Sequence, residues 1–277
     1  MTGPAPRRAA VLGSPIAHSL SPALHRAAYQ ALGLTAWSYD RFEVDEDALP
    51  GFLAGLGPEW AGLSLTMPLK RAVLPLLDAV SPAAASVAAV NTVLFTPDGR
   101  RTGDNTDIPG MVRALRERGT TTVERATVLG AGATAASALA ALAEVCSGEV
   151  TACVRSAERA AEMRSWGERL GVAVRTAPWS EAPRALAAPL VIATTPAGAA
   201  DDLAPAVPAT PGTLFDVVYH PWPTPLAAAW SARGGTVLGG LDLLVHQAVL
   251  QVEAMTGHAP GPLAAMREAG QAALAAH

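Results

Sequence analysis

Short apolar runs alternate with helix-like segments over the first hundred residues. Strand-like runs cover residues 8–13, 36–44 and 61–66, and helix-like segments cover 21–33, 47–56 and 68–78, with a further short helix after Ser81. Ser21 followed by Pro22 predicts an N-cap with proline at the first helical position. Residues 91–105 predict a hairpin, with Pro-Asp-Gly at 97–99 as its turn. This alternation predicts an α/β domain.

The pattern changes at about residue 106, where a helix is expected to begin and to run to Gly119. Six near-continuous apolar runs then follow, as expected of strands buried on both faces of a parallel sheet. They lie at 126–130, 149–154, 171–176, 189–194, 213–219 and 235–239. Residues 106–240 therefore predict a doubly wound, Rossmann-type domain. The tail forms two helices, over 241–257 and after 261–263, which we expect to return to the first domain.

We accordingly expect one domain from residues 1–105 plus 241–277 and another from 106–240, with the crevice between them as the site. The charge and composition of the chain exclude two classes of binding partner. The chain of 277 residues carries a formal charge of −4 with 16% charged residues, so it offers no basic field for nucleic acid or an anionic membrane.

The sequence also predicts a soluble cytoplasmic protein. Cys146 and Cys153 are too few for a disulfide framework and lack metal-ligand spacing, so no metal is expected. The apolar run after Arg8 is too short for a secretory signal. The uncharged run at 126–143 is too weakly apolar to span a bilayer.

A glycine-rich loop follows the first strand of the second domain. Gly130, Gly132 and Ala135 form G-x-G-x-x-A directly before an alanine-rich helix, with Ala131 and Ala133 between and after the glycines. The first glycine permits a tight turn, the second lets a pyrophosphate approach the backbone, and the small third residue allows close helix packing. A plain strand-to-helix turn is the alternative explanation.

Arg155, Ser156 and Arg159 follow the second strand of that domain. An NAD-binding fold usually places an acidic residue there for the ribose 2′-hydroxyl, whereas a guanidinium suits a 2′-phosphate. We therefore predict NADP as the cofactor. The alternative is that the arginines are solvated surface charges with Glu158 as a partner.

Four polar clusters occupy strand ends of the first domain. They contain Ser19 and Ser21, Thr66 and Lys70, Asn91, and Asp107. Each has an ordinary explanation as a helix cap, a loop residue or a surface charge. A lysine in the first turn of a helix opposes the helix dipole, however, and the chain is poor in lysine.

Together the clusters resemble the shikimate dehydrogenase family. The matching stretches are G-x-P-I-x-H-S-x-S-P at 13–22, L-T-x-P-x-K at 65–70, A-V-N-T at 89–92, N-T-D at 105–107, D-V-x-Y-x-P-x-x-T-P-L at 216–226, and the helix at 243–248 with Gln247. The resemblance spans nearly the whole chain. It implies reversible hydride transfer between NADPH and the C3 carbonyl of 3-dehydroshikimate, giving shikimate.

The resemblance also implies residue roles. Lys70 and Asp107 would form the catalytic pair, in which the Lys70 ammonium stabilises the developing alkoxide, and the sequence leaves open which of the two carries the transferred proton. Substrate contacts would come from Ser19, Ser21, Thr66, Asn91, Tyr219 and Gln247. Cofactor contacts would come from residues 130–133, Arg155, Ser156, Arg159, Thr195, Gly240 and Leu243.

The match has departures, and alternatives remain. Ala133, Ala193 and Leu243 replace residues usual in the family near the cofactor, which bears on cofactor affinity rather than on the reaction. The rivals are a paralogue acting on quinate, a dinucleotide-binding regulator without turnover, and a methyltransferase using the glycine loop. The sequence leaves open whether the chain is a monomer or a homodimer.

Overall fold

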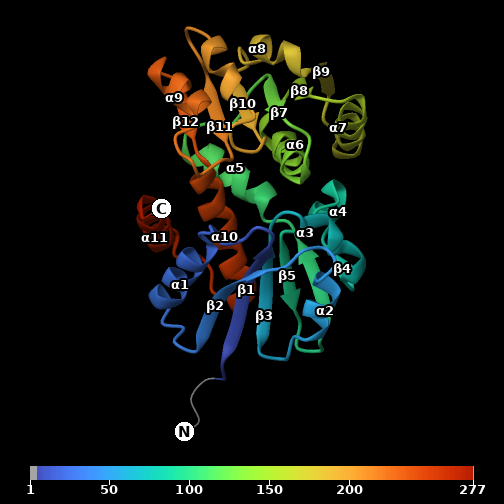
Figure 1. Ribbon diagram of the computed structural model, residues 1–277, viewed down its shortest axis with the longest axis vertical. Helices are drawn as coiled ribbons and strands as arrows, with labels where there is room; N and C mark the ends of the chain where they lie inside the picture. Colours follow the sequence, from blue (N-terminus) through green and yellow to red (C-terminus); the bar gives the residue numbers. More distant parts are fainter. Residues whose placement is uncertain (1–4, 277) are drawn as a thin grey trace. The chain divides into compact units, whose positions relative to one another are not determined.

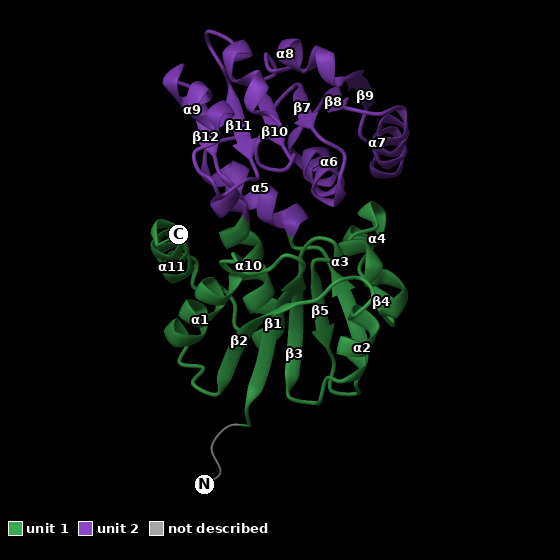
Figure 2. Ribbon diagram, in the orientation of Figure 1, with its two compact units in different colours: residues 1–106, 244–277 green, residues 107–243 purple. Residues whose placement is uncertain are grey.

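The computed structural model describes residues 5–276, which divide into two compact units (Figures 1 and 2). Unit 1 comprises residues 1–106 and 244–277, and unit 2 comprises residues 107–243. None of the helices within residues 5–276 combines the length and apolar character that a bilayer crossing requires. The fold is α/β, with one six-stranded sheet in each unit, as the sequence predicts.

Unit 1 contains a mixed sheet in the order β2-β1-β3-β5-β6-β4. Its strands are β1 (Arg7–Gly13), β2 (Trp37–Glu43), β3 (Trp60–Leu65), β4 (Ala79–Val80), β5 (Thr92–Phe95) and β6 (Arg101–Asp104). Strands β1, β2 and β3 are parallel, and β5 and β6 form the expected antiparallel hairpin. Its helices are α1 (Ser21–Ala31), α2 (Leu49–Ala54), α3 (Leu69–Ala72), α4 (Pro82–Val87), most of α10 (Gly240–Thr256), and α11 (Leu263–Ala275).

Alternating residues of β1 build two apolar cores, one on each face of this sheet. Ala10 and Leu12 pack with α2 and α3 residues such as Leu53 and Leu69. Ala9 and Val11 pack on the opposite face with a group that includes Tyr29 of α1 and Met255 of α10. Helix α11 lies against α1, so the C-terminal helices belong to unit 1, as expected (Figure 2).

The helix expected at 68–78 is wrong in its extent. Helix α3 ends at Ala72, a single 3₁₀ turn follows at Leu74–Leu76, and Leu77 is extended before β4. Pro75 explains the break, because proline lacks the N–H that an α-helix needs and disfavours helical geometry in the preceding residue. Strand β4 was not expected.

Unit 2 contains an all-parallel sheet in the order β12-β11-β10-β7-β8-β9, the doubly wound order that the apolar runs predict. Its strands are β7 (Ala126–Leu129), β8 (Val150–Val154), β9 (Val174–Pro178), β10 (Leu190–Ala193), β11 (Thr213–Asp216) and β12 (Thr236–Leu238). Helices α5 (Asp107–Glu117), α6 (Ala133–Val145) and α7 (Ala157–Leu170) pack side by side in series, with α6 on β7 and α7 on β8 and β9. Helices α8 (Ala182–Ala185) and α9 (Pro225–Ala232), with 3₁₀ turns at Trp179–Glu181 and Asp201–Ala206, contribute to an apolar core that contains Trp230.

Candidate functional site

Two loops of unit 1 leave the same edge of its sheet. Strands β1 and β3 are parallel neighbours, and they end at Gly13 and Leu65. The Thr66 N–H donates to the Leu12 carbonyl oxygen at 3.0 Å, and the Ser14 N–H donates to the Met67 carbonyl oxygen at 3.1 Å. A Cβ on Gly13 would lie 2.4 Å from Thr66 Cγ2, so a glycine there lets the loops approach. The loops therefore begin side by side.

Ser19 and Ser21 lie where the first of these loops enters α1. The expectation that Ser21 is the N-cap is wrong, because Leu20 occupies that position and Ser21 is the first helical residue. Ser19 Oγ accepts a hydrogen bond from the Ser21 N–H at 3.3 Å. Ser21 is buried and Ser19 is half-buried. Both hydroxyl-bearing residues therefore lie at a helix N-terminus, where free N–H groups favour an anion.

Asn91 is the centre of a buried polar cluster at the same sheet edge. Its Oδ1 accepts hydrogen bonds from the Thr106 N–H at 2.8 Å, the Thr106 hydroxyl at 3.1 Å and the Thr92 hydroxyl at 2.8 Å. A backbone N–H can only donate, so the atom that it contacts is the oxygen and the orientation of the carboxamide is fixed. The Val90 N–H donates to the Lys70 carbonyl oxygen at 2.8 Å, which ties the Asn91 segment to α3.

Helix α10 contributes two glutamines to this cluster. Gln247 Oε1 lies 3.4 Å from the Thr106 hydroxyl oxygen, and Gln247 Nε2 donates to the Leu244 carbonyl oxygen at 2.8 Å. One turn later, Gln251 Nε2 donates to the Asn91 carbonyl oxygen at 3.2 Å and to the Thr92 hydroxyl at 3.0 Å. The sequence interpretation missed Gln251 and Thr106. The spacing of four residues from Gln247, which places Gln251 on the same helix face, was the available signal.

The cluster continues inward from Gln251 to β3 and β2. Ser64 Oγ donates to Gln251 Oε1 at 2.7 Å and accepts from the Tyr39 hydroxyl at 2.6 Å. All three side chains are buried, and burial raises the pKa of Tyr39. A chain of hydrogen bonds between neutral groups thus runs from Tyr39 through Ser64 and Gln251 to the Asn91 carbonyl oxygen.

Lys70 and Asp107 each lie in the first turn of a helix. Lys70 is the second residue of α3 and is half-buried. Asp107 is the first residue of α5, is 5% exposed and has the favourable charge for a helix N-terminus. Lys70 belongs to unit 1 and Asp107 to unit 2. Their pairing in one site stays a prediction.

The glycine-rich loop of unit 2 adopts a geometry that only glycine tolerates easily. Gly130 has φ +113°, and a Cβ there would lie 2.7 Å from Thr194 Oγ1. A Cβ on Gly132 would meet no atom within 4 Å, so the backbone faces open space directly before α6. Ala135 is fully buried against the sheet. This arrangement fits a dinucleotide pyrophosphate.

The two arginines that follow β8 differ in their partners. Arg155 Nη2 donates to the Ala199 carbonyl oxygen at 2.7 Å. Arg159 Nη1 forms an ion pair with Glu162 Oε2 at 2.7 Å, rather than with Glu158. Ser156 caps α7, because its Oγ accepts from the Arg159 N–H at 3.2 Å. Ser156 thus has a structural role at the position where we expected a cofactor contact.

The remaining expected contacts lie on loops of unit 2 and at the start of α10. Asp216 closes the loop that carries Tyr219, accepting from the Thr224 hydroxyl at 2.7 Å and the Val218 N–H at 3.2 Å. Burial raises the pKa of Tyr219 and, against these hydrogen bonds, that of Asp216. The other three residues are Thr195 after β10, Gly240 at the first position of α10, and the buried Leu243.

Gly240 is required by packing alone, because a Cβ there would lie 2.2 Å from the Val217 carbonyl oxygen. Within residues 5–276, no group of three or more His, Cys, Asp or Glu side chains is arranged to hold a metal ion.

Comparisons with known proteins give a consistent result. Residues 11–93 match the model of the shikimate dehydrogenase substrate binding domain, and residues 240–269 match the shikimate 5'-dehydrogenase C-terminal domain. The chain is 41% identical over 257 residues to a shikimate dehydrogenase (NADP(+)) of Oleidesulfovibrio alaskensis, covering 89% of this chain and 88% of that protein.

Solved structures agree over the whole chain. The shikimate dehydrogenase of Mycobacterium tuberculosis superposes with a TM-score of 0.88 at 44% identity, covering 98% of this chain and all of that one. The Thermus thermophilus enzyme in complex with NADP(H) and shikimate gives a TM-score of 0.84 at 37% identity, covering 96% of this chain and 99% of that one.

Proposed function

Because this chain belongs to the shikimate dehydrogenase family, we infer that it catalyses the reversible NADPH-dependent reduction of 3-dehydroshikimate to shikimate, a step of aromatic amino acid biosynthesis. The observation that carries this function is the identity of 36–41% to NADP-dependent shikimate dehydrogenases over most of the chain. The enzyme is an oxidoreductase whose cofactor is NADP and whose substrate is a small molecule.

We propose that unit 1 binds the substrate and unit 2 binds NADP. The match of residues 11–93 to a substrate binding domain supports the first assignment, and the open backbone at Gly132 supports the second. Ser19 and Ser21 of unit 1 would bind the substrate carboxylate, and Tyr219 of unit 2 is proposed as a further contact of the substrate. The ring hydroxyls would be held by Thr66, Lys70, Asn91 and Gln247 of unit 1 and by Asp107 of unit 2.

In unit 2, residues 130–133 would hold the pyrophosphate, and Arg155, Ser156 and Arg159 would surround the 2′-phosphate. Thr195, Gly240 and Leu243 would contact the rest of the cofactor. We also place the reaction in the cytoplasm, because Cys146 and Cys153 are both free thiols.

In the chemical step, the substrate C3 carbonyl gains a hydride and its oxygen gains a proton, which gives shikimate and NADP⁺. The reduced nicotinamide supplies the hydride when the cofactor is bound. We assign Lys70 to the developing alkoxide, where its ammonium stabilises the negative charge and donates the proton. Asp107 would orient Lys70 and the substrate hydroxyl. One preorganised donor of this kind contributes about 3 kcal/mol to the transition state.

Replacement of Lys70 tests this assignment. Lys70→Ala should lower kcat by about 100-fold or more while the thermal unfolding temperature stays close to wild type. The assay follows NADPH absorbance with shikimate and NADP⁺, in parallel with quinate and with NAD⁺. Unchanged turnover would remove Lys70 from the chemistry. Faster turnover of quinate would favour the paralogue, and no turnover of either would favour the regulator.

A second test uses the fact that Lys70 is the only lysine in the sequence. An amine-specific acylating reagent can therefore modify only this side chain and the N-terminal amine. We expect saturating shikimate to slow the acylation of Lys70, as followed by mass spectrometry of the peptide. The N-terminal amine is the internal control. Equal rates with and without shikimate would place Lys70 outside the substrate site.

A further inference from the structure

The guanidinium of Arg155 lies over an indole ring. Arg155 Cζ is 4.7 Å from the centre of the Trp179 ring, within the range of a cation–π interaction. Arg155 Nη2 also donates to the Ala199 carbonyl oxygen at 2.7 Å. A guanidinium has five N–H donors, so these two partners hold the group while leaving most of its donors for a ligand.

The location of this pair connects it to the cofactor edge of unit 2. Arg155 directly follows β8, and Trp179 directly follows the neighbouring strand β9. Both therefore lie at the carboxyl edge of the parallel sheet, as do Gly130 and Gly132. In doubly wound folds this edge binds the dinucleotide, and the residues after the second strand select the 2′-substituent of the ribose.

The partner of the Arg155 guanidinium is an aromatic ring and not a carboxylate, and this affects phosphate binding. No carboxylate of residues 5–276 forms an ion pair with Arg155, whereas Arg159 is held by Glu162 at 2.7 Å. A carboxylate beside Arg155 would neutralise its charge and repel an incoming phosphate. An indole face holds the cation without adding a negative charge.

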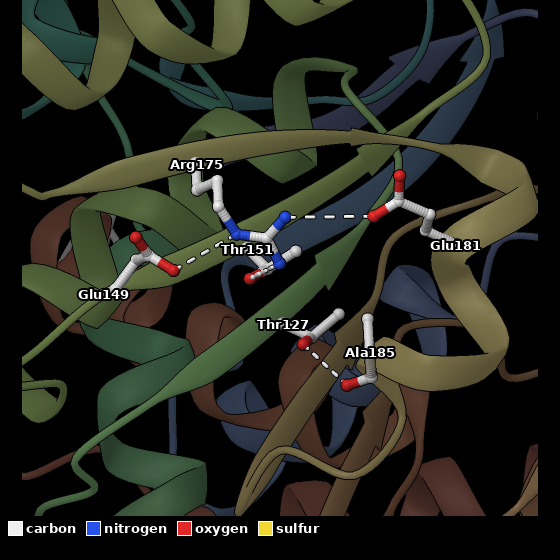
Figure 3. Close-up of polar contacts among 6 residues, drawn as sticks. All are labelled: Thr127, Glu149, Thr151, Arg175, Glu181 and Ala185. Carbon is white, nitrogen blue, oxygen red and sulfur yellow. Dashed lines mark hydrogen bonds and ion pairs between the residues drawn. The ribbon is translucent and has the colours of Figure 1, made fainter.

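Trp179 is itself anchored to the sheet. Its half-buried ring packs against the apolar core of unit 2. The 3₁₀ turn that it begins carries Glu181, which lies 3.9 Å from Arg175 Nη1, and Arg175 also contacts Glu149 at 3.2 Å and Thr151 at 3.1 Å (Figure 3). The following helix is held by a hydrogen bond of 2.8 Å from the Thr127 hydroxyl to the Ala185 carbonyl oxygen. Strands β7, β8 and β9 thus fix the segment 179–185.

We propose that Trp179 is a positioning residue that holds the Arg155 guanidinium where the 2′-phosphate of NADP binds, and that it thereby contributes to the selection of NADP over NAD. The inference rests on the proposed function in taking Arg155 as the phosphate ligand. Trp179 acts through Arg155, so its effect is confined to ligands that carry the 2′-phosphate.

Two variants of similar volume test the role of the ring. Trp179→Phe keeps an aromatic face, and Trp179→Leu keeps apolar bulk without one. The probes are adenosine 2′,5′-bisphosphate and 5′-AMP, which differ only in the 2′-phosphate, with affinities measured by calorimetry. In Trp179→Leu we expect affinity for the bisphosphate to fall about 5- to 10-fold and affinity for 5′-AMP to change less than about 2-fold. Trp179→Phe should retain most of the bisphosphate affinity.

Kinetics and a double variant separate positioning from a general structural effect. Trp179→Leu should raise KM for NADP⁺ but not for NAD⁺, with kcat at saturating cofactor unchanged. In an Arg155→Ala background, Trp179→Leu should have no further effect on bisphosphate affinity. Equal losses for both nucleotides, no loss for either, or additive losses in the double variant would overturn the proposal. If wild type binds the bisphosphate tightly but does not oxidise shikimate, the proposed function fails while this inference stands.

Discussion

His25 of α1 is a buried imidazole that should make stability depend on pH. Its ring is fully buried, stacked on Tyr39 with centroids 3.9 Å apart and edge-on to Tyr29 at 6.1 Å. Neither ring nitrogen has a hydrogen-bond partner within residues 5–276. Burial lowers the pKa of His25 from 6.5 to about 3, and the nearby Gln251 side chain, which acts in the opposite direction without reaching hydrogen-bond geometry, is outweighed.

The sign of the effect follows from the two protonation states. The unfolded chain takes up a proton near pH 6.5, whereas the folded chain does so only near pH 3, so acid favours unfolding. The contribution of His25 to stability is complete above pH 6.5 and is lost as the pH falls toward 3. Each pH unit in this window costs about 1.4 kcal/mol, so a change from about pH 7.5 to about pH 4.5 should cost about 2.7 kcal/mol.

His25→Phe removes this titration while keeping an aromatic ring on Tyr39. Urea unfolding of wild type and variant at the two pH values gives four free energies of unfolding. The fall in the free energy of unfolding between the two pH values should be smaller in the variant by about 2.7 kcal/mol. The larger ring can lower stability by about 1–3 kcal/mol, but it does so at both pH values and cancels in the difference.

Two further variants provide a substitute for His25→Phe and a control for the replacement of a histidine by phenylalanine. His25→Gln removes the titration with a smaller side chain, and it replaces His25→Phe if the phenyl ring prevents folding. His258→Phe is the matched control, because it makes the same replacement at an exposed side chain. An equal fall in stability in wild type and in both His25 variants would refute the reasoning.

Three other substitutions probe the glycine-rich loop, a helix cap and the polar cluster around Asn91. Gly130→Ala places a Cβ at φ +113° and 2.7 Å from Thr194 Oγ1, so stability should fall by about 1–3 kcal/mol and KM for NADP⁺ should rise; a wild-type melting curve would contradict this. Ser81→Ala removes the acceptor of the Ala84 N–H at 3.1 Å and should lower the free energy of unfolding by about 1 kcal/mol in urea, whereas a loss within error would show that water replaces the cap. Gln247→Ala should raise KM for shikimate about 10-fold with kcat nearly unchanged, and a lower melting temperature with normal KM would indicate a purely structural residue.

The sequence predicts unit 2 well because each of its strands is specified locally. An apolar run of five to seven residues between turns is enough to identify a strand buried on both faces, and all six expected strands are present. The turn at Gly130 and the helix cap at Ser81 are predictable for the same reason, because each depends on residues that are close in the sequence. The broken helix after Pro68 was mistaken because helical periodicity outweighed the effect of Pro75.

The polar cluster around Asn91 was only half predictable. Asn91 and Gln247 follow from a family pattern, and the spacing of four residues from Gln247 was a signal for Gln251, whereas Thr106 and Ser64 have no local pattern that indicates their partners. The hydrogen bond from Ser64 to Gln251 joins residues 187 positions apart. Such partners become visible only when the sheet and α10 are in place.

The two segments of unit 1 are separated in the sequence by unit 2, and this affects how the chain folds while it is being translated. Residues 107–243 form a continuous stretch that a ribosome finishes before it makes Gln247 and Gln251. Domains generally fold as units during translation, with the earlier one first. Here we expect the reverse order, because the polar cluster around Asn91 in unit 1 stays incomplete until residues 244–277 have been translated. A nascent chain stalled after residue 243 should therefore acquire nucleotide affinity before it acquires any for shikimate.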